Sequence, residues 1–248
     1  MLRLLIIPAA GVGSRLGGTV PKVLVQVGGV PMLDRILALH ATAVDGVVVV
    51  LHPAFAAEVQ RHIMARADRD RIATAIQQAP TGMLDAILAA APAVDRAAPS
   101  SIWITWCDQV AVHPHTIERL AALTSARPDA AIVMPTVTRT DPYIHLERDA
   151  AGRIVRVLHR REGDAMPDAG ESDMGLFALS SHAYRDLLPA YAREVETGGA
   201  TGERNFLPFI PWAAARAAVT TFACEHPMEA VGVNTPDELR AVEAYLAG

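Results

Sequence analysis

Apolar runs of strand length alternate with helix-like segments along the first half of the chain. The runs are rich in β-branched residues and too short for most helices, so they indicate buried strands. We predict strands at residues 4–7, 47–51, 71–77, 101–106 and 130–134, and helices at residues 31–39, 54–67, 82–91 and 114–125. Because right-handed crossovers connect parallel strands, this order predicts a mostly parallel sheet covered by helices. Ligands of such sheets bind beyond the carboxyl ends of the strands.

Residues 2–22 place a glycine-rich turn directly after the first predicted strand. Pro8 is expected to end that strand, since proline has no N–H for a sheet ladder. Arg15 and Lys22 bring two positive charges to the turn. Glycine amides and two cations are what a polyphosphate site needs, although a structural strand-to-helix turn would use the same glycines. The glycines are Gly11, Gly13, Gly17 and Gly18.

The details of this turn exclude two common phosphate-binding motifs. A dinucleotide fingerprint would place its third glycine one position earlier and an acid after the next strand, but here that strand leads into His52 and Pro53. A Walker loop needs Gly-Lys-Ser or Gly-Lys-Thr, and neither tripeptide occurs in the chain.

The segment AAGVGSRLGGTVPK, from Ala9 to Lys22, closely resembles the signature of nucleotidyltransferases of the sugar-phosphate pyrophosphorylase type. It is similar to the uridylyltransferase domain of the bifunctional N-acetylglucosamine-1-phosphate enzymes. The resemblance implies a Rossmann-like three-layer α/β fold of the nucleotide-diphospho-sugar transferase type, with an antiparallel hairpin inserted near the acceptor site. It also implies that Arg15 and Lys22 are catalytic. The nucleotide-binding residues implied in this loop are Ala9, Ala10, Gly11, Gly13, Ser14, Arg15 and Lys22.

Length and composition predict a single nucleotidyltransferase domain over residues 1–248, because no linker-like tract divides the chain. We expect a nucleotide-binding half at residues 1–137 and an acceptor-binding half at residues 138–248. A net charge of −5 gives no broad basic surface, which argues against nucleic acid as a partner. The two cysteines, Cys107 and Cys224, form neither a disulfide framework nor a metal-binding pattern.

The chain carries no apolar run of the roughly 18 residues that a membrane span needs, and no signal-peptide pattern. We therefore expect a cytoplasmic protein without a membrane partner; a homo-oligomer is possible. The hexapeptide repeats of the bifunctional enzymes are missing, so we expect their second activity to be missing as well.

Asp108 follows the predicted strand at residues 101–106, at the edge where ligands bind. A carboxylate there can hold Mg²⁺ between phosphates, although a cap for the helix at residue 114 explains it equally well. The resemblance implies that Asp108 is a metal ligand. Cys107 replaces the glycine of the family's Gly-Asp pair, and Gln109 matches the Asp-Gln of related molybdopterin cytidylyltransferases.

The segment EAVGVN, which ends at Asn234, resembles the E-x-x-G-V-N motif of the same family. The resemblance implies that Asn234 is the second Mg²⁺ ligand, through its carbonyl oxygen. Asn234 or Thr235 can also cap the last predicted helix, residues 236–246, and the two roles are compatible.

The segment QAPTGM, from Gln78 to Met83, resembles the family's base-reading Q-L-G-T-G-H. The resemblance implies that Gln78, Thr81 and Gly82 contact the base, and a side-chain amide can pair with a pyrimidine edge. An ordinary loop with Thr81 as a helix cap is the alternative. Pro80 replaces a glycine, which leaves UTP and CTP as the candidate donors.

The second half of the chain contains a predicted β-hairpin, residues 144–147 and 154–158, around a turn at residues 149–152. Arginines follow it densely enough to bind an anionic group, although a solvated surface would also show them. We assign Arg160 and Arg161 to the acceptor site, with Asp173 and Gly175, and Arg153 and Arg156 to a solvated face. The family's residues for N-acetylglucosamine are replaced here, so we expect a different acceptor.

These residues together predict a Mg²⁺-dependent nucleotidyltransferase that transfers a nucleoside monophosphate from UTP or CTP to a phosphorylated acceptor such as a sugar 1-phosphate. One alternative is a cytidylyltransferase for a phosphonate, phosphocholine-like or molybdopterin acceptor. A second alternative is a non-catalytic nucleotide-binding protein. The two expected Mg²⁺ ligands, Asp108 and Asn234, argue against the second alternative, because nucleotide binding alone would not need them.

Overall fold

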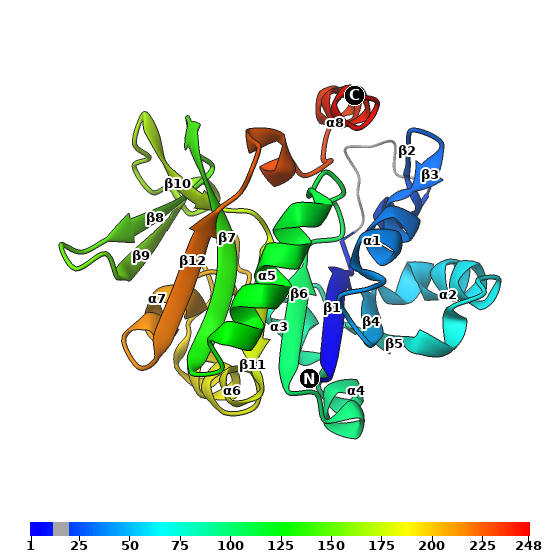
Figure 1. Ribbon diagram of the computed structural model, residues 1–248, viewed down its shortest axis with the longest axis horizontal. Helices are drawn as coiled ribbons and strands as arrows, with labels where there is room; N and C mark the ends of the chain where they lie inside the picture. The colour runs from blue at the N-terminus through cyan, green and yellow to red at the C-terminus, as the bar shows by residue number, and fades with distance from the viewer. Residues whose placement is uncertain (12–19) are drawn as a thin grey trace.

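The computed structural model describes residues 1–11 and 20–248, and its centre is a twisted eight-stranded sheet (Figure 1). The strand order is β10-β7-β11-β6-β1-β4-β5, and β12 pairs with β7. The strands are β1 Arg3–Ala9, β4 Gly46–Leu51, β5 Ile72–Ile76, β6 Ser101–Thr105, β7 Ala130–Thr140, β10 Ala169–Asp173, β11 Leu176–Ser180 and β12 Ala218–Ala223. Pairs β6-β1, β1-β4, β4-β5 and β7-β12 are parallel, whereas β10 and β11 run antiparallel to β7.

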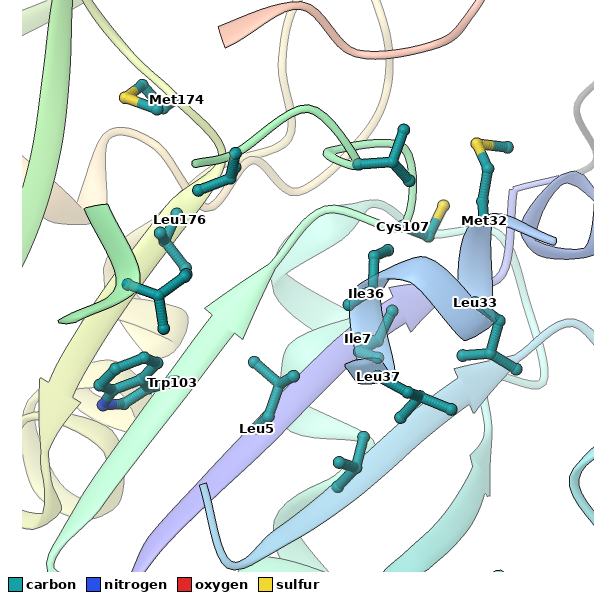
Figure 2. Packing of buried hydrophobic residues seen from close by; sticks show 14 of the residues in the cluster. Leu5, Ile7, Met32, Leu33, Ile36, Leu37, Trp103, Cys107, Met174 and Leu176 are labelled. Carbon is teal, nitrogen blue, oxygen red and sulfur yellow. The ribbon is translucent and has the colours of Figure 1, made fainter. Parts of the chain in front are cut away.

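Helices cover both faces of the sheet and make a three-layer structure, as predicted. Helices α1 Met32–His40, α2 Ala56–Met64, α5 Pro114–Ala126 and α8 Pro236–Leu246 contribute to one core cluster, and α3 Met83–Leu88, α4 Ala91–Ala97, α6 Leu188–Glu194 and α7 Phe209–Ala214 contribute to the other. Successive residues of β1 point to opposite faces, so Leu5 and Ile7 join the first cluster and Leu4 and Ile6 the second. Figure 2 shows Leu5 and Ile7 beside α1.

Two hairpins project from the central sheet. Strands β2 Gln26–Val27 and β3 Val30–Pro31 form a short hairpin that leads into α1. Strands β8 Ile144–Arg148 and β9 Ile154–His159 form the predicted antiparallel hairpin, which lies beside β10 (Figure 1). The predicted α/β fold with an inserted hairpin is therefore confirmed.

Several boundaries differ from the predictions. Pro8 does not end β1, which continues to Ala9 with Pro8 opposite Val50. The proline is tolerated because β6 pairs with β1 only as far as Ile6, so no ladder bond on that side is lost. The predicted helix at residues 82–91 is the shorter α3, Met83–Leu88, and a second short helix, α4 Ala91–Ala97, follows it. Strand β10 and helices α6 and α7 were not predicted, because their sequences carry weak periodicity.

In the described ranges, 1–11 and 20–248, no helix has both the length and the apolar character needed to cross a bilayer.

Candidate active site

Lys22, Asp108 and Asn234 meet at the edge of the sheet where β1 and β6 end. Lys22 opens a 3₁₀ turn, Lys22–Leu24, that is anchored by the buried Val23. The Nζ atom of Lys22 lies 2.6 Å from Oδ2 of Asp108 and 2.6 Å from Oδ1 of Asn234. Folding thus brings Lys22 into contact with one residue that is 86 positions away in the sequence and with another that is 212 positions away. The turn at Lys22, the loop after β6 and the segment before α8 Pro236–Leu246 meet at this point.

The Lys22–Asp108 ion pair is shielded from water, with side-chain exposures of 13% and 12%. Burial opposes the charge of the lysine, but the charge of Asp108 and its hydrogen bond to the ammonium outweigh that effect and raise the pKa of Lys22. Lys22 is therefore a cation at neutral pH. Burial raises the pKa of Cys107 to about 12, so this side chain is a neutral thiol that packs as a small apolar group.

The N-terminus of α8 holds Asn234 in place. The N–H of Asn234 donates to Oε2 of Glu238 over 2.9 Å, and the N–H of Val233 donates to the carbonyl of Asp108 over 3.2 Å. Thr235 is the N-cap of α8, since its hydroxyl accepts from the N–H of Glu238. The prediction of a cap at this position is confirmed, and the cap leaves the side-chain oxygen of Asn234 free to face Lys22.

A fully buried carboxylate, Glu229, ties together the chain segments that carry Asp108 and Asn234. Its Oε2 accepts from the N–H of His113 and the hydroxyl of Thr116, at 2.9 and 2.6 Å. Its Oε1 accepts from the N–H groups of Glu225 and His226, each at 2.9 Å. The first two donors lie at the start of α5, after Asp108, and the other two lie before Asn234. Glu229 therefore fixes one loop against the other.

The donor chemistry of this site fits a magnesium ion. A carboxylate oxygen of Asp108 and an amide oxygen of Asn234 both contact the ammonium group of Lys22. Oxygen ligands of these two kinds are what Mg²⁺ prefers. No group of three or more His, Cys, Asp and Glu side chains with metal-binding geometry occurs in the part of the chain described here. Asp108 and Asn234 can therefore supply two ligands, and phosphate oxygens and water would supply the rest.

A smaller cavity, of about 160 Å³, opens at the end of β1 and is lined by Pro8, Ala10, Gly11, Gln77, Pro80 and Gly82. Gly82 has φ +118°, and a Cβ there would lie 2.5 Å from the backbone of Arg204, so only glycine fits. Of the loop residues predicted to bind nucleotide, Gly11 and Ala10 line this cavity and Ala9 is buried. Gly13, Ser14 and Arg15 lie outside the described residues.

Gln77, rather than the predicted Gln78, faces this smaller cavity. Gln77 is buried, and its Nε2 donates to the carbonyl of Gly82 over 2.9 Å. Gln78 is exposed and lies outside the lining, because neighbouring residues at a strand end point to opposite sides. Thr81 is exposed and does not cap α3, whose N-cap residue is Gly82. The carbonyl of Thr81 instead accepts from the N–H of Arg204.

A larger cavity, of about 470 Å³, lies between Asp108 and the β8–β9 hairpin. Of the residues predicted to bind the acceptor, Arg161, Asp173 and Gly175 line it. Arg160 lies outside the lining and forms an ion pair with Asp141. Arg153 and Arg156 are exposed and pair with acids of the hairpin region, in keeping with a solvated face. The predicted acceptor site did not include Trp106, Arg139, Tyr143 and His159, which also line the cavity.

Gly175 and Asp173 shape the floor of this cavity. Gly175 has φ +65°, and a Cβ there would lie 2.1 Å from the ring of Trp106, so the indole packs directly on the glycine backbone. The N–H of Gly175 donates to Oδ2 of Asp173 over 2.8 Å. Burial outweighs this hydrogen bond and raises the pKa of Asp173 to about 6.

The network around His159 fixes the proton on its ring. The N–H of Leu207 donates to Oδ1 of Asn205 over 3.0 Å, which assigns the other end of the amide as Nδ2. That Nδ2 lies 3.0 Å from Nδ1 of His159 and donates to it. Burial, the largest effect, lowers the pKa of His159, so the ring is neutral and carries its proton on Nε2. The cavity thus gains a neutral hydrogen-bond donor.

Comparison with known proteins agrees with this geometry. Residues 5–173 match the MobA-like NTP transferase domain. Over 248 residues the chain is 29% identical to the bifunctional protein GlmU of Sorangium cellulosum, an alignment that covers 98% of this chain and 51% of that protein. It is 30% identical over 247 residues to the bifunctional protein GlmU of Cereibacter sphaeroides strain ATCC 17025, with 97% and 51% covered. The chain spans about half the length of the curated relatives it matches.

The resemblance inferred from the glycine-rich loop is thereby confirmed, since the family match covers most of the chain and includes that loop. The chain belongs to the family of MobA-like NTP transferase domains and is a nucleotidyltransferase.

Proposed function

We propose that the protein transfers a nucleoside monophosphate from UTP or CTP to a phosphorylated small molecule, such as a sugar 1-phosphate, and releases pyrophosphate in a Mg²⁺-dependent reaction. The observation that carries the proposal is the meeting of Lys22, Asp108 and Asn234 beside the larger cavity. Phosphoryl transfer needs cationic groups at this kind of point, because negative charge on the phosphates must be neutralised.

In the proposed mechanism, the smaller cavity receives the base and the larger cavity receives the acceptor. Arg15 and the amides of the glycine-rich turn hold the β- and γ-phosphates. Asp108 and Asn234 would hold Mg²⁺, which supplies charge neutralisation and orients the phosphates.

Lys22 neutralises the α-phosphate while an acceptor phosphate oxygen attacks the α-phosphorus in line and pyrophosphate leaves. No general base is required, because a phosphate monoester is already an anion at neutral pH. Positioning and electrostatics therefore supply the rate enhancement.

The chain acts in this proposal as one domain, residues 1–248, with residues 1–137 binding nucleotide and residues 138–248 binding the acceptor. Arg161, Asp173 and Gly175 contact the acceptor, and Arg160 supports the same side from outside the lining. The acceptor differs from N-acetylglucosamine 1-phosphate, because the residues expected for that sugar are replaced. No nucleic acid or membrane takes part.

A second candidate is a cytidylyltransferase for a phosphonate, phosphocholine-like or molybdopterin acceptor, because the pair Asp108-Gln109 matches the Asp-Gln of the molybdopterin cytidylyltransferases. Gln109 lines the larger cavity beside Asp108, and its Oε1 is buried without a hydrogen-bond partner among the described residues. This unpaired side-chain oxygen can accept a hydrogen bond from an N–H or O–H group of the bound substrate.

The test is a thermal-shift comparison of the four ribonucleoside triphosphates, each with and without Mg²⁺. A nucleotide at 100 times its dissociation constant should stabilise the protein by about 2.7 kcal/mol. We expect a Mg²⁺-dependent shift with UTP or CTP alone, and that nucleotide then serves in a screen of acceptors by pyrophosphate release. Absence of such a shift with all four would favour a non-catalytic protein and overturn the proposal.

A further inference from the structure

Lys22 forms hydrogen bonds to the same two oxygens that are proposed to bind Mg²⁺. Its Nζ lies 2.6 Å from Oδ2 of Asp108 and 2.6 Å from Oδ1 of Asn234. The backbone of both residues is fixed, since the carbonyl of Asp108 accepts from Val233 and the N–H of Asn234 donates to Glu238. In this arrangement the ammonium group takes the position between the two ligands. The following inference rests on the proposed function, because it concerns the metal of that reaction.

Lys22 and a metal ion cannot use these oxygens in the same way at the same time. Magnesium binds oxygen at about 2.0–2.1 Å, so an ion coordinated by both oxygens would lie within about 5 Å of Nζ in its present position. The pair is shielded from water, which makes the repulsion between two such cations strong. A metal ion between the two oxygens would also compete for the lone pairs toward which the ammonium hydrogens point.

We infer that Lys22 is an internal cation that occupies the metal position of the free enzyme and leaves it when metal and nucleotide arrive together. In the free enzyme, Lys22 neutralises the buried carboxylate of Asp108 and holds the oxygen of Asn234 beside it. When a nucleoside triphosphate binds, its phosphates offer Lys22 new anionic partners. The carboxylate then pairs with the incoming metal ion, so it always has one cation.

The position of Lys22 in the chain is suited to this exchange. Its backbone belongs to the Lys22–Leu24 turn, which the buried Val23 anchors, while its side chain is a flexible four-carbon stem with a compact charge. The stem can turn from the carboxylate to a phosphate without movement of the sheet. Metal and nucleotide should therefore bind cooperatively, and each should bind weakly alone at this site.

The test measures Mn²⁺ binding to the protein without nucleotide, by electron paramagnetic resonance of the free ion and by calorimetry. Lys22→Met removes the charge and keeps the bulk of the stem. Lys22→Gln is a second variant that can still donate to Asp108, in case the first does not fold. We expect either variant to bind Mn²⁺ about tenfold or more tightly than the wild type, which lies within the usual range of coupling between two sites.

Two controls locate the gained affinity. Arg127→Met removes one positive charge from an exposed turn before β7, and its Mn²⁺ affinity should equal that of the wild type. Adding Asp108→Asn to Lys22→Met should remove the gain. Equal Mn²⁺ affinity in wild type and both Lys22 variants would overturn the inference, as would a gain that survives Asp108→Asn.

A second measurement follows the coupling itself. Addition of the nucleotide identified by thermal shift should tighten Mn²⁺ binding in the wild type by a larger factor than in Lys22→Gln, because the lysine no longer has to be displaced in the variant. The same factor in both proteins would also contradict the inference. The thermal shift of the wild type with nucleotide is read separately, so failure of the proposed function and failure of this inference can be told apart.

Discussion

Lys22 shows how a single side chain serves two partners at the residue scale. Its ammonium contacts a carboxylate and a neutral amide at equal distances, and both contacts are to residues proposed as metal ligands. An ion pair in this shielded position costs desolvation, and that cost is acceptable where the charges take part in chemistry. These contacts are the basis of the proposed role of Lys22 in catalysis.

Lys22→Ala should lower turnover by about a hundredfold or more, since removing one preorganised donor from a charged transition state typically has this effect. The measurement is steady-state pyrophosphate release with the nucleotide and acceptor found in the screen. Arg127→Ala, at an exposed position, is the matched control and should retain normal turnover. Near-normal turnover in Lys22→Ala would disprove its catalytic role.

Asp173 gives a prediction about stability and pH. Its folded-state pKa of about 6 is raised above the usual value of 3.8, so the folded protein binds a proton more readily than the unfolded chain. Its contribution to stability is present below about pH 4 and is lost as pH rises through about 6.

Asp173→Asn, which removes this charge, should therefore be more stable than the wild type by about 2 kcal/mol at pH 7.5, and equally stable near pH 4. Urea unfolding at the two pH values checks the difference. A variant that gains nothing at pH 7.5 would show that the carboxylate is not penalised.

His159 gives a prediction about a proton position. We expect nitrogen NMR of labelled protein to show the tautomer with the proton on Nε2, because Asn205 donates to Nδ1. Asn205→Asp replaces that donor by a carboxylate and should raise the pKa of His159 by about one unit or more. Asn205→Ala is the control for loss of the contact alone. A proton on Nδ1 in the wild type would contradict the assignment.

At the scale of elements, the loop between β12 and α8 is held against the start of α5 by one buried carboxylate. Glu229 accepts four hydrogen bonds and has no exposed surface. This arrangement sets the distance between Asp108, which precedes α5, and Asn234, which precedes α8. The two proposed metal ligands therefore depend on a residue that touches neither of them directly.

Glu229→Gln should destabilise the protein by about 2–6 kcal/mol, because the amide nitrogen cannot accept from its two buried donors and each loss costs about 1–3 kcal/mol. It should also raise the Mg²⁺ concentration needed for half-maximal activity. The control is Tyr184→Phe, which removes a buried hydrogen bond to the carbonyl of Ile87, away from Asp108 and Asn234. It should reduce stability without this effect on the Mg²⁺ concentration. Equal Mg²⁺ dependence in the two variants would limit Glu229 to a structural role.

At the scale of the whole molecule, the core on the α1 face of the sheet contains one completely buried histidine. His40 packs edge-on against Trp103, and its Nδ1 lies 2.9 Å from the carbonyl of Ile36. Burial lowers the pKa of His40 from 6.5 to about 4. Between these values the unfolded chain binds a proton that the folded protein does not, so stability falls as pH falls from about 6.5 to about 4.

The loss should amount to about 3 kcal/mol over that range, since each pKa unit corresponds to about 1.4 kcal/mol. Urea unfolding of wild type and His40→Gln between pH 7 and pH 4 measures it, and the variant should lose less stability on acidification. The same pH dependence in both proteins would mean that other groups cause it. Asp173 acts in the opposite direction, so the Asp173→Asn variant shows the effect of His40 more clearly.

The sequence alone determined the layers of the fold and the family, because both depend on local patterns. The alternation of apolar strands and helices predicts the sheet, and the segment from Ala9 to Lys22 identifies the nucleotidyltransferase signature. The positions of Asp108 and Asn234 followed from motifs, since one follows a buried strand and the other precedes a capped helix.

Only the tertiary structure decided which neighbouring side chains face the cavities and which distant ones meet. Gln77 rather than Gln78 lines the smaller cavity, because adjacent residues at the end of a strand point to opposite sides. Arg161 rather than Arg160 lines the larger one, because the two residues lie in a 3₁₀ turn and Arg160 is turned toward Asp141. The contacts of Lys22 with Asp108 and Asn234, and those of Glu229, join segments far apart in the chain. Such contacts depend on strand order and loop packing, which no local pattern encodes.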